Sequence, residues 1–148
     1  MLKDFSLKFV DVMIGVVLGV GFQWWPELHD FWQHVAFLFI YLNLVDFWID
    51  YSPTLKKFPI KREFDVIIHT FLVFLMFYMI YSVTLSIQHI FISYGIFRLL
   101  DILWIHRMRK GYPVSESDMK FLSGWNRQDI KECIGITILF ILRNFMSL

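Results

Sequence analysis

The chain has 148 residues, of which 57% are hydrophobic and 18% are charged, and its formal net charge is +1. This composition excludes a water-soluble domain, because a soluble chain of this length does not need so much apolar surface. The charge balance indicates no nucleic-acid partner. Cys133 is the only cysteine, which excludes an intrachain disulfide and a cysteine-based metal cluster. We therefore expect an all-α integral membrane protein.

Four apolar segments have lengths near the roughly 20 residues that cross a bilayer, and a fifth segment is weaker. In chain order they are residues 5–25, 31–49, 66–87, 90–105 and 130–146. The connections are short, so the first four segments are expected to form two antiparallel helical hairpins. We predict a four-helix transmembrane bundle over residues 1–110. Residues 111–148 are predicted to add an amphipathic segment and a C-terminal hydrophobic helix.

The charges of the connecting segments predict how the helices are oriented. Lysine and arginine gather at residues 56–62 and 106–110, whereas the connections at 26–30 and 88–89 contain neither. Positively charged loops remain on the cytoplasmic side, which predicts a cytoplasmic N-terminus. Trp48 and Trp104 are expected near the cytoplasmic membrane surface, where tryptophan is enriched.

The residues after Gly111 have a more mixed composition. Ser115 and Asp118 have the spacing of a helix-capping motif, which predicts a helix start there. The segment up to Asp129 fits either an interfacial amphipathic helix or a cytoplasmic helix. Arg143 interrupts the final apolar segment, which either spans the membrane, tilts with Arg143 at the surface, or lies against the bundle.

One face of the first helix carries an acidic residue and two glycines. Asp11, Gly15 and Gly19 recur at every fourth position, and Gly15 to Gly19 is a GxxxG motif. Such a face permits close helix packing. It also fits the lining of a narrow pathway, in which Asp11 would attract cations.

Further ionisable groups lie inside the second and fourth apolar segments. Asn43 and Asp46 share one helical face, and Asp101 follows Arg98 by three residues. Arg98 is expected to pair with Asp101 and with Asp46 or Asp11. Charged residues in hydrocarbon are costly, so this set indicates either a structural salt-bridge network or a site for ions or protons.

Histidines give a weaker signal. His69 follows Asp65 by one helical turn, which fits a proton relay or a hydrogen-bonded packing histidine. His34 and His89 both belong near the outer surface, but two histidines do not define a haem or metal site. No catalytic motif appears, so the sequence predicts neither an enzyme nor a cofactor.

The start of the chain resembles a known family. Phe9-Val10-Asp11, followed by Ile14, Val17 and Leu18, is similar to the first helix of the endosomal and prokaryotic potassium channels, which bears an FSD motif. Val10 stands where that motif has serine. The resemblance implies that the first helices of several subunits line a pore, with Ile14, Val17 or Leu18 as an apolar constriction.

Two functions of different classes follow from these patterns. The first is a small oligomeric channel or transporter for cations or protons, acting in the bilayer through a polar cluster on the cytoplasmic side. The predicted pathway residues are Asp11, Gly15, Gly19, Asn43, Asp46, His69, Arg98 and Asp101. The alternative is a non-catalytic membrane subunit or scaffold, whose buried charges pair with each other or with a membrane partner subunit.

Overall fold

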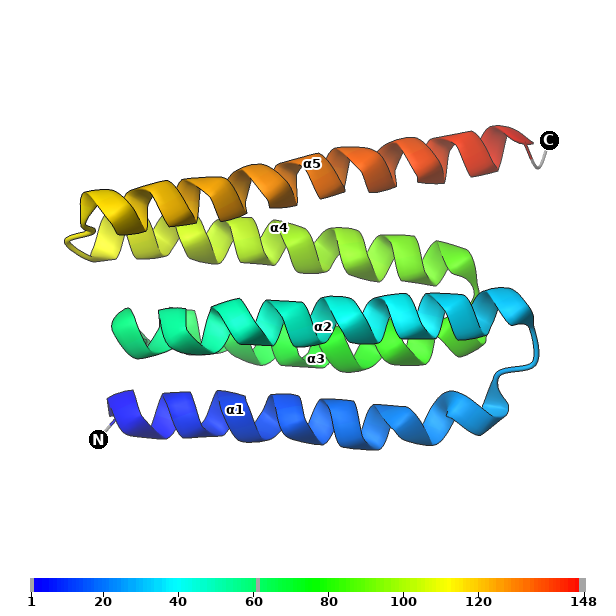
Figure 1. The fold of residues 1–148 in the computed structure, drawn as a ribbon, viewed down its shortest axis with the longest axis horizontal. Coiled ribbons are helices and arrows are strands. Elements are labelled where there is room, and N and C mark those ends of the chain that lie inside the picture. The colour runs from blue at the N-terminus through cyan, green and yellow to red at the C-terminus, as the bar shows by residue number, and fades with distance from the viewer. Residues whose placement is uncertain (1, 61, 147–148) are drawn as a thin grey trace. The chain divides into compact units, whose positions relative to one another are not determined.

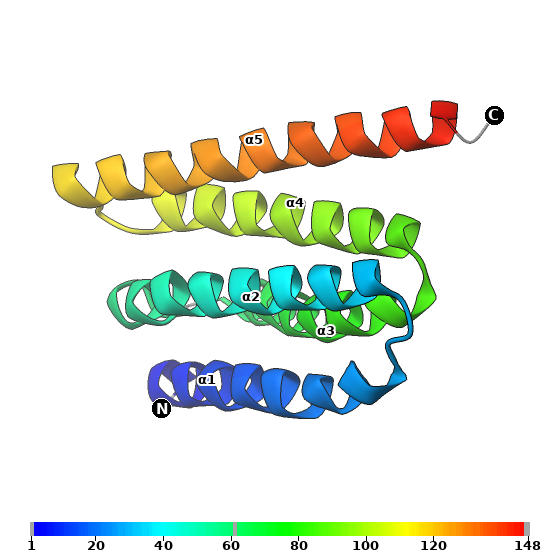
Figure 2. The same cartoon turned by 45° about the vertical axis from the view of Figure 1, so that its right-hand side comes forward.

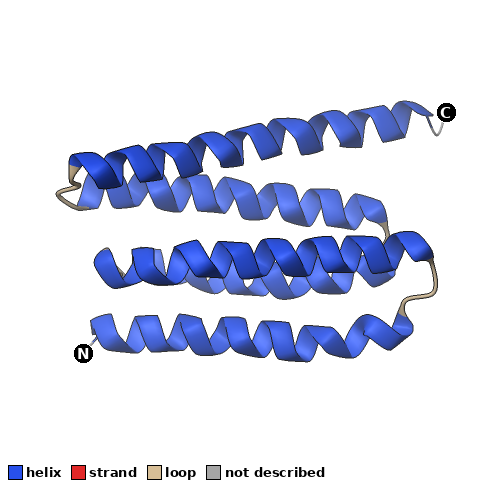
Figure 3. Cartoon of the chain, in the orientation of Figure 1, coloured by secondary structure: helices blue, strands red, loops and turns tan. Residues whose placement is uncertain are grey.

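The computed structural model describes residues 2–60 and 62–146, with side chains for residues 8–60 and 62–145. Within these ranges all regular structure is helical, which confirms the all-α prediction (Figures 1 and 3). The elements are α1 (Leu2–Gly21), the 3₁₀ helix η1 (Phe22–Glu27), α2 (Phe31–Lys57), α3 (Glu63–Leu85), α4 (Ile87–Gly111) and α5 (Glu116–Met146). Lys61, one of the predicted loop cations, lies outside the described residues.

Four helical segments are long and apolar enough to cross a membrane. They are Lys8–Glu27, which comprises most of α1 and η1, and the helices α2, α3 and α4. A chain with four such segments is an integral membrane protein. Charged side chains interrupt α5, so it does not qualify on composition.

Several helices continue beyond the apolar segments that predict them. α2 extends to Lys57, because Tyr51 and Leu55 are buried and keep its last turns packed. α5 is one continuous helix from Glu116, whereas the sequence suggested an amphipathic segment followed by a separate helix. The predicted cap is confirmed, since the Asp118 backbone N–H donates to Ser115 Oγ at 3.3 Å.

The chain forms two compact units, which we call unit 1 (Met1–Ile90) and unit 2 (Phe91–Leu148). Unit 1 contains α1, η1, α2 and α3, and unit 2 contains most of α4 and all of α5. The division at residue 110 expected from the sequence separates α4 from α5, whereas unit 2 keeps these two helices together.

Unit 1 is held together mainly by apolar packing. α1, α2 and α3 run side by side and contact one another (Figures 1 and 2). Its core includes Ile14 from α1, Phe37 and Ile40 from α2, and Met79 and Ile80 from α3, all of them almost inaccessible. In a bilayer such side chains stabilise the helix contacts by close van der Waals packing, because lipid is as apolar as the core.

Two close contacts fix the helices of unit 1. A Cβ atom built on Gly21 would lie 2.7 Å from Ile80 Cδ1 and 3.1 Å from the Tyr41 hydroxyl, so a larger residue here would displace these side chains. At the start of α2, Asp30 and Gln33 form a capping box, and Gln33 Nε2 donates to the Val83 carbonyl of α3 at 3.1 Å. The Tyr41 hydroxyl donates to the Leu18 carbonyl and joins α2 to α1.

Unit 2 is an antiparallel pair formed by α4 and α5 (Figure 2). Phe97 and Ile105 of α4 and Leu122 of α5 are buried, and the rings of Trp104 and Trp125 meet edge to face at 5.7 Å. Trp104 is only 4% exposed because its ring packs against α5, and its place near the cytoplasmic membrane surface stays a prediction. Hydrogen bonds and ion pairs also join the two helices.

Candidate functional site

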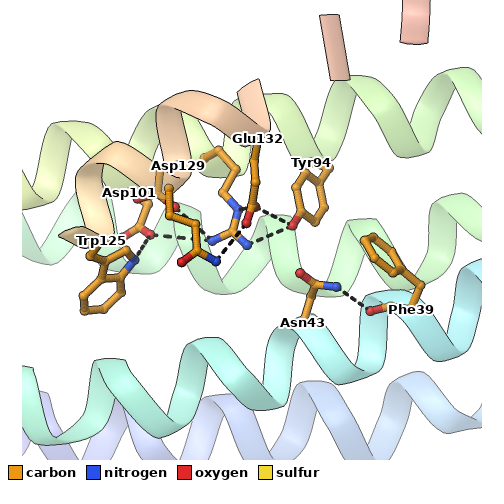
Figure 4. A network of polar contacts seen from close by, with 9 residues as sticks. Phe39, Asn43, Tyr94, Asp101, Trp125, Asp129 and Glu132 are labelled. Carbon is orange, nitrogen blue, oxygen red and sulfur yellow. Dashed lines mark hydrogen bonds and ion pairs between the residues drawn. The ribbon is translucent and has the colours of Figure 1, made fainter. Parts of the chain in front are cut away.

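Six polar or aromatic residues of unit 2 form a connected group, which we call the α4–α5 cluster (Figure 4). Its members are Tyr94, Arg98 and Asp101 from α4, and Trp125, Asp129 and Glu132 from α5. Each set follows the spacing of four and then three residues, which places its members on one helical face. The two faces meet within the antiparallel pair.

Arg98 is the centre of the cluster and is only 6% exposed. Its Nη1 lies 3.1 Å from Asp129 Oδ1, and its Nε lies 2.6 Å from Glu132 Oε2. Nη2 donates to the Tyr94 hydroxyl at 2.8 Å, and that hydroxyl donates to Glu132 Oε2 at 2.8 Å. One guanidinium therefore binds α5 through two carboxylates, with Tyr94 as a second link.

Asp101 and Trp125 lie at one end of the cluster, as Figure 4 shows. Its Oδ2 accepts a hydrogen bond from Trp125 Nε1 at 3.0 Å and lies 3.9 Å from Arg98 Nη1. Asp101 and Asp129 are both completely buried. Both carboxyl groups lie beside the same nitrogen, Arg98 Nη1, Asp129 at 3.1 Å and Asp101 at 3.9 Å. Two acidic groups thus lie together beside one cation.

The α4 residues of the cluster belong to a segment that can span a bilayer. Arg98 and Asp101 are near the middle of α4. Ionised groups in such a place are stabilised only by close partners, because hydrocarbon does not solvate them. The cluster supplies those partners from within unit 2.

The structure confirms the predicted pairing of Arg98 with Asp101. The other predicted pathway residues belong to unit 1. There, Asp11 Oδ1 accepts a hydrogen bond from Trp48 Nε1 at 3.2 Å, and Asn43 Nδ2 donates to the Phe39 carbonyl at 2.8 Å (Figure 4). Pairing of Arg98 with Asp11 or Asp46 stays a prediction.

His69 is buried in unit 1, with its ring centre 5.6 Å from that of Tyr51. Cβ atoms built on Gly15 and Gly19 would meet no atom within 4 Å among the described residues outside their own helical turns. The GxxxG face of α1 is therefore open, and Gly21 makes the close approach instead.

Sequence reasoning missed four of the six cluster residues: Tyr94, Trp125, Asp129 and Glu132. Two signals could have indicated them. Arg98 has a single carboxylate near it on its own helix, although a buried guanidinium has five N–H donors to satisfy. The spacing 94, 98, 101 also recurs at 125, 129, 132, which identifies two polar faces that match.

A metal site requires several donor atoms directed at one point. Among the described residues, no group of three or more histidine, cysteine, aspartate or glutamate side chains could hold a metal ion. In the α4–α5 cluster, the guanidinium of Arg98 lies where its carboxylates converge.

Comparisons with protein-family models, curated proteins and solved structures return no match. The fold defines the class as a helical integral membrane protein, and the site adds a buried ionic cluster within it. The resemblance to potassium channels stays a prediction. Ile14 and Val17, which it implies for a constriction, lie in the core of unit 1.

Proposed function

We propose that this chain is a small membrane transport protein for protons or cations, with the α4–α5 cluster as its site. The observation that carries the proposal is that three carboxyl groups converge on one guanidinium of a segment that can span a bilayer. Ionisable groups inside membrane segments are costly to bury, and they commonly mark proton relays and ion pathways.

The chemistry of the cluster fits reversible binding of a positive charge. Three ionised carboxylates against one guanidinium leave two negative charges in excess. A proton or a cation reduces this excess. Glu132 is the most exposed of the three, with a quarter of its side chain accessible, so it is the natural point of entry from water.

The predicted pathway residues of unit 1 remain part of this proposal. Asp46 is exposed, and Asp11 is half-buried on an open face with Gly15 and Gly19. This face could receive a helix of a second copy, as the expected oligomer requires. A cytoplasmic N-terminus follows from the positive loops and is part of the same proposal.

Flux into liposomes tests the proposal. Purified protein would be reconstituted at known orientation, and proton, potassium and sodium gradients applied in turn. We expect flux of one of these ions that Asp129→Asn reduces at least tenfold, because the amide carries no charge. Glu116→Gln is the matched control, since it neutralises an exposed carboxylate on the same helix. Wild-type protein that is folded and passes none of these ions would contradict the proposal.

A structural role is the second candidate, and one observation favours it. The four polar partners of Arg98, namely Tyr94, Asp101, Asp129 and Glu132, all belong to unit 2. An arginine bound in this way can have a purely structural role, which is to hold α5 against α4 in a subunit or scaffold. This role predicts that Arg98→Ala disrupts assembly and that no variant or wild-type protein transports ions.

A further inference from the structure

We propose that the ligand of the α4–α5 cluster is a single proton, shared between the carboxyl groups of Asp101 and Asp129. The proposal selects the proton from the two classes of ion considered above. It begins from the geometry of these two carboxyl groups and from the hydrogen bonds that they do and do not receive.

Each of the two carboxyl groups has one oxygen without a donor. Asp101 Oδ1 and Asp129 Oδ2 are buried, and no N–H or O–H among the described residues reaches them. The other two oxygens are satisfied, by Trp125 Nε1 at Asp101 and by Arg98 Nη1 at Asp129. An oxygen buried without a donor is unfavourable, and more so when its group is charged.

The two carboxyl groups lie beside the same nitrogen, Arg98 Nη1, and ionised carboxylates are acceptors only. A hydrogen bond between them therefore needs a proton on one of the two. With that proton in place, one group donates and the other accepts. One proton thus supplies the bond that the pair lacks.

The surrounding groups favour one proton. Arg98 and Glu132 are the charged groups that face the pair, and Tyr94 and Cys133 are the other titratable groups near it. Arg98 compensates one negative charge, and Glu132 contributes another. A proton on the pair lowers the excess of negative charge from two to one.

A metal cation fits the same position less well. It would need several oxygen ligands directed at one point, whereas Arg98 Nη1 already lies 3.1 Å from Asp129 and 3.9 Å from Asp101. A proton needs no coordination shell. On uptake it leaves a hydronium ion and bonds to a carboxylate oxygen, and on release it returns to water.

The claim that the protein transports this proton rests on the proposed function. The shared proton itself can be measured without transport. Infrared spectroscopy of wild-type protein in lipid, recorded across a pH titration, detects the C=O stretch of a protonated carboxylic acid. We expect this band at neutral pH and its loss at alkaline pH. Asp101→Asn and Asp129→Asn should each remove it, and Glu116→Gln should leave it unchanged.

Absence of the band from folded wild-type protein at neutral pH would overturn the inference, whatever the variants do. Persistence of the band in both asparagine variants would also overturn it. A titrating band in protein without flux would leave the shared proton standing and contradict transport. Sodium or potassium flux without the band would support transport and contradict the proton.

Discussion

Unit 1 and unit 2 are both built from long apolar helices, yet different interactions hold each of them together. In unit 1, apolar side chains fill the space between three helices, and polar links such as Gln33 to Val83 are single hydrogen bonds. In unit 2, ion pairs of Arg98 join α5 to α4. Well-packed apolar residues hold helices as well as buried ions do, so cohesion alone does not require the ionic cluster of unit 2.

Arg98→Ala should have the largest effect, because it leaves Asp129 and Glu132 in place without their cation. Breaking a buried ion pair from one side costs about 3–5 kcal/mol. We expect unit 2 to loosen while unit 1 keeps its structure. Chemical unfolding in detergent would measure the loss, and labelling of the half-buried thiol of Cys133 would locate it.

Arg98→Lys is the control for charge, and it should recover only part of the stability since lysine lacks the planar fork. Ordinary surface substitutions change the unfolding free energy by up to about 0.5 kcal/mol. A change no larger than this for Arg98→Ala would contradict the claim that ion pairs hold unit 2 together.

Trp125→Phe separates the contribution of ring packing in unit 2 from that of a hydrogen bond. It retains an aromatic ring against Trp104 but removes the hydrogen bond to Asp101 Oδ2. We expect a loss of about 1.5–3 kcal/mol, because the acceptor is a buried carboxyl group. The same unfolding measurement tests this, and an equal loss in protein that already carries Asp101→Ala, which has no acceptor, would show that the indole acts by packing alone.

Gly21→Ala tests the apolar packing of unit 1. The added methyl group would lie 2.7 Å from Ile80 Cδ1, and overpacking of this kind costs about 1–3 kcal/mol. Ile80→Val removes the obstructing Cδ1 atom. We therefore predict that the double variant is more stable than the sum of the two single changes implies. Strict additivity would contradict the close contact.

Gly15→Ala should have the smallest effect, and of opposite sign. Its Cβ atom meets nothing within 4 Å among the described residues beyond its own turns. Replacing a helical glycine by alanine stabilises by about 0.5–1 kcal/mol when there is room. Analytical ultracentrifugation of the same variant adds a test of the proposed oligomer, since weaker association would place a second copy on this face.

The sequence alone predicts the helical class and the four apolar segments, because hydropathy reports directly on length and composition. It does not predict where the helices end. Tyr51 and Leu55 extend α2 by tertiary packing, which no apolar window records. α5 continues through a charged region because its polar face lies against α4, and this pairing is absent from the local pattern.

The same reasoning explains which part of the site was predicted. Arg98 and Asp101 lie three residues apart on one helix, so their pairing follows from helical spacing. Asp129 and Glu132 lie on another helix, and only the packing of α5 on α4 brings them to Arg98. The interpretation of residues 111–129 as an interfacial or cytoplasmic segment separated Asp129 from its partner.

Proton flux into liposomes, compared between wild type, Asp101→Asn and Glu116→Gln, tests the central claim most directly. All three proteins would first be shown to have equal helix content and orientation. The account predicts proton flux in wild type and in Glu116→Gln, and at least a tenfold reduction in Asp101→Asn. Equal flux in all three proteins, or flux in none of them, would contradict a proton site in the α4–α5 cluster that serves transport.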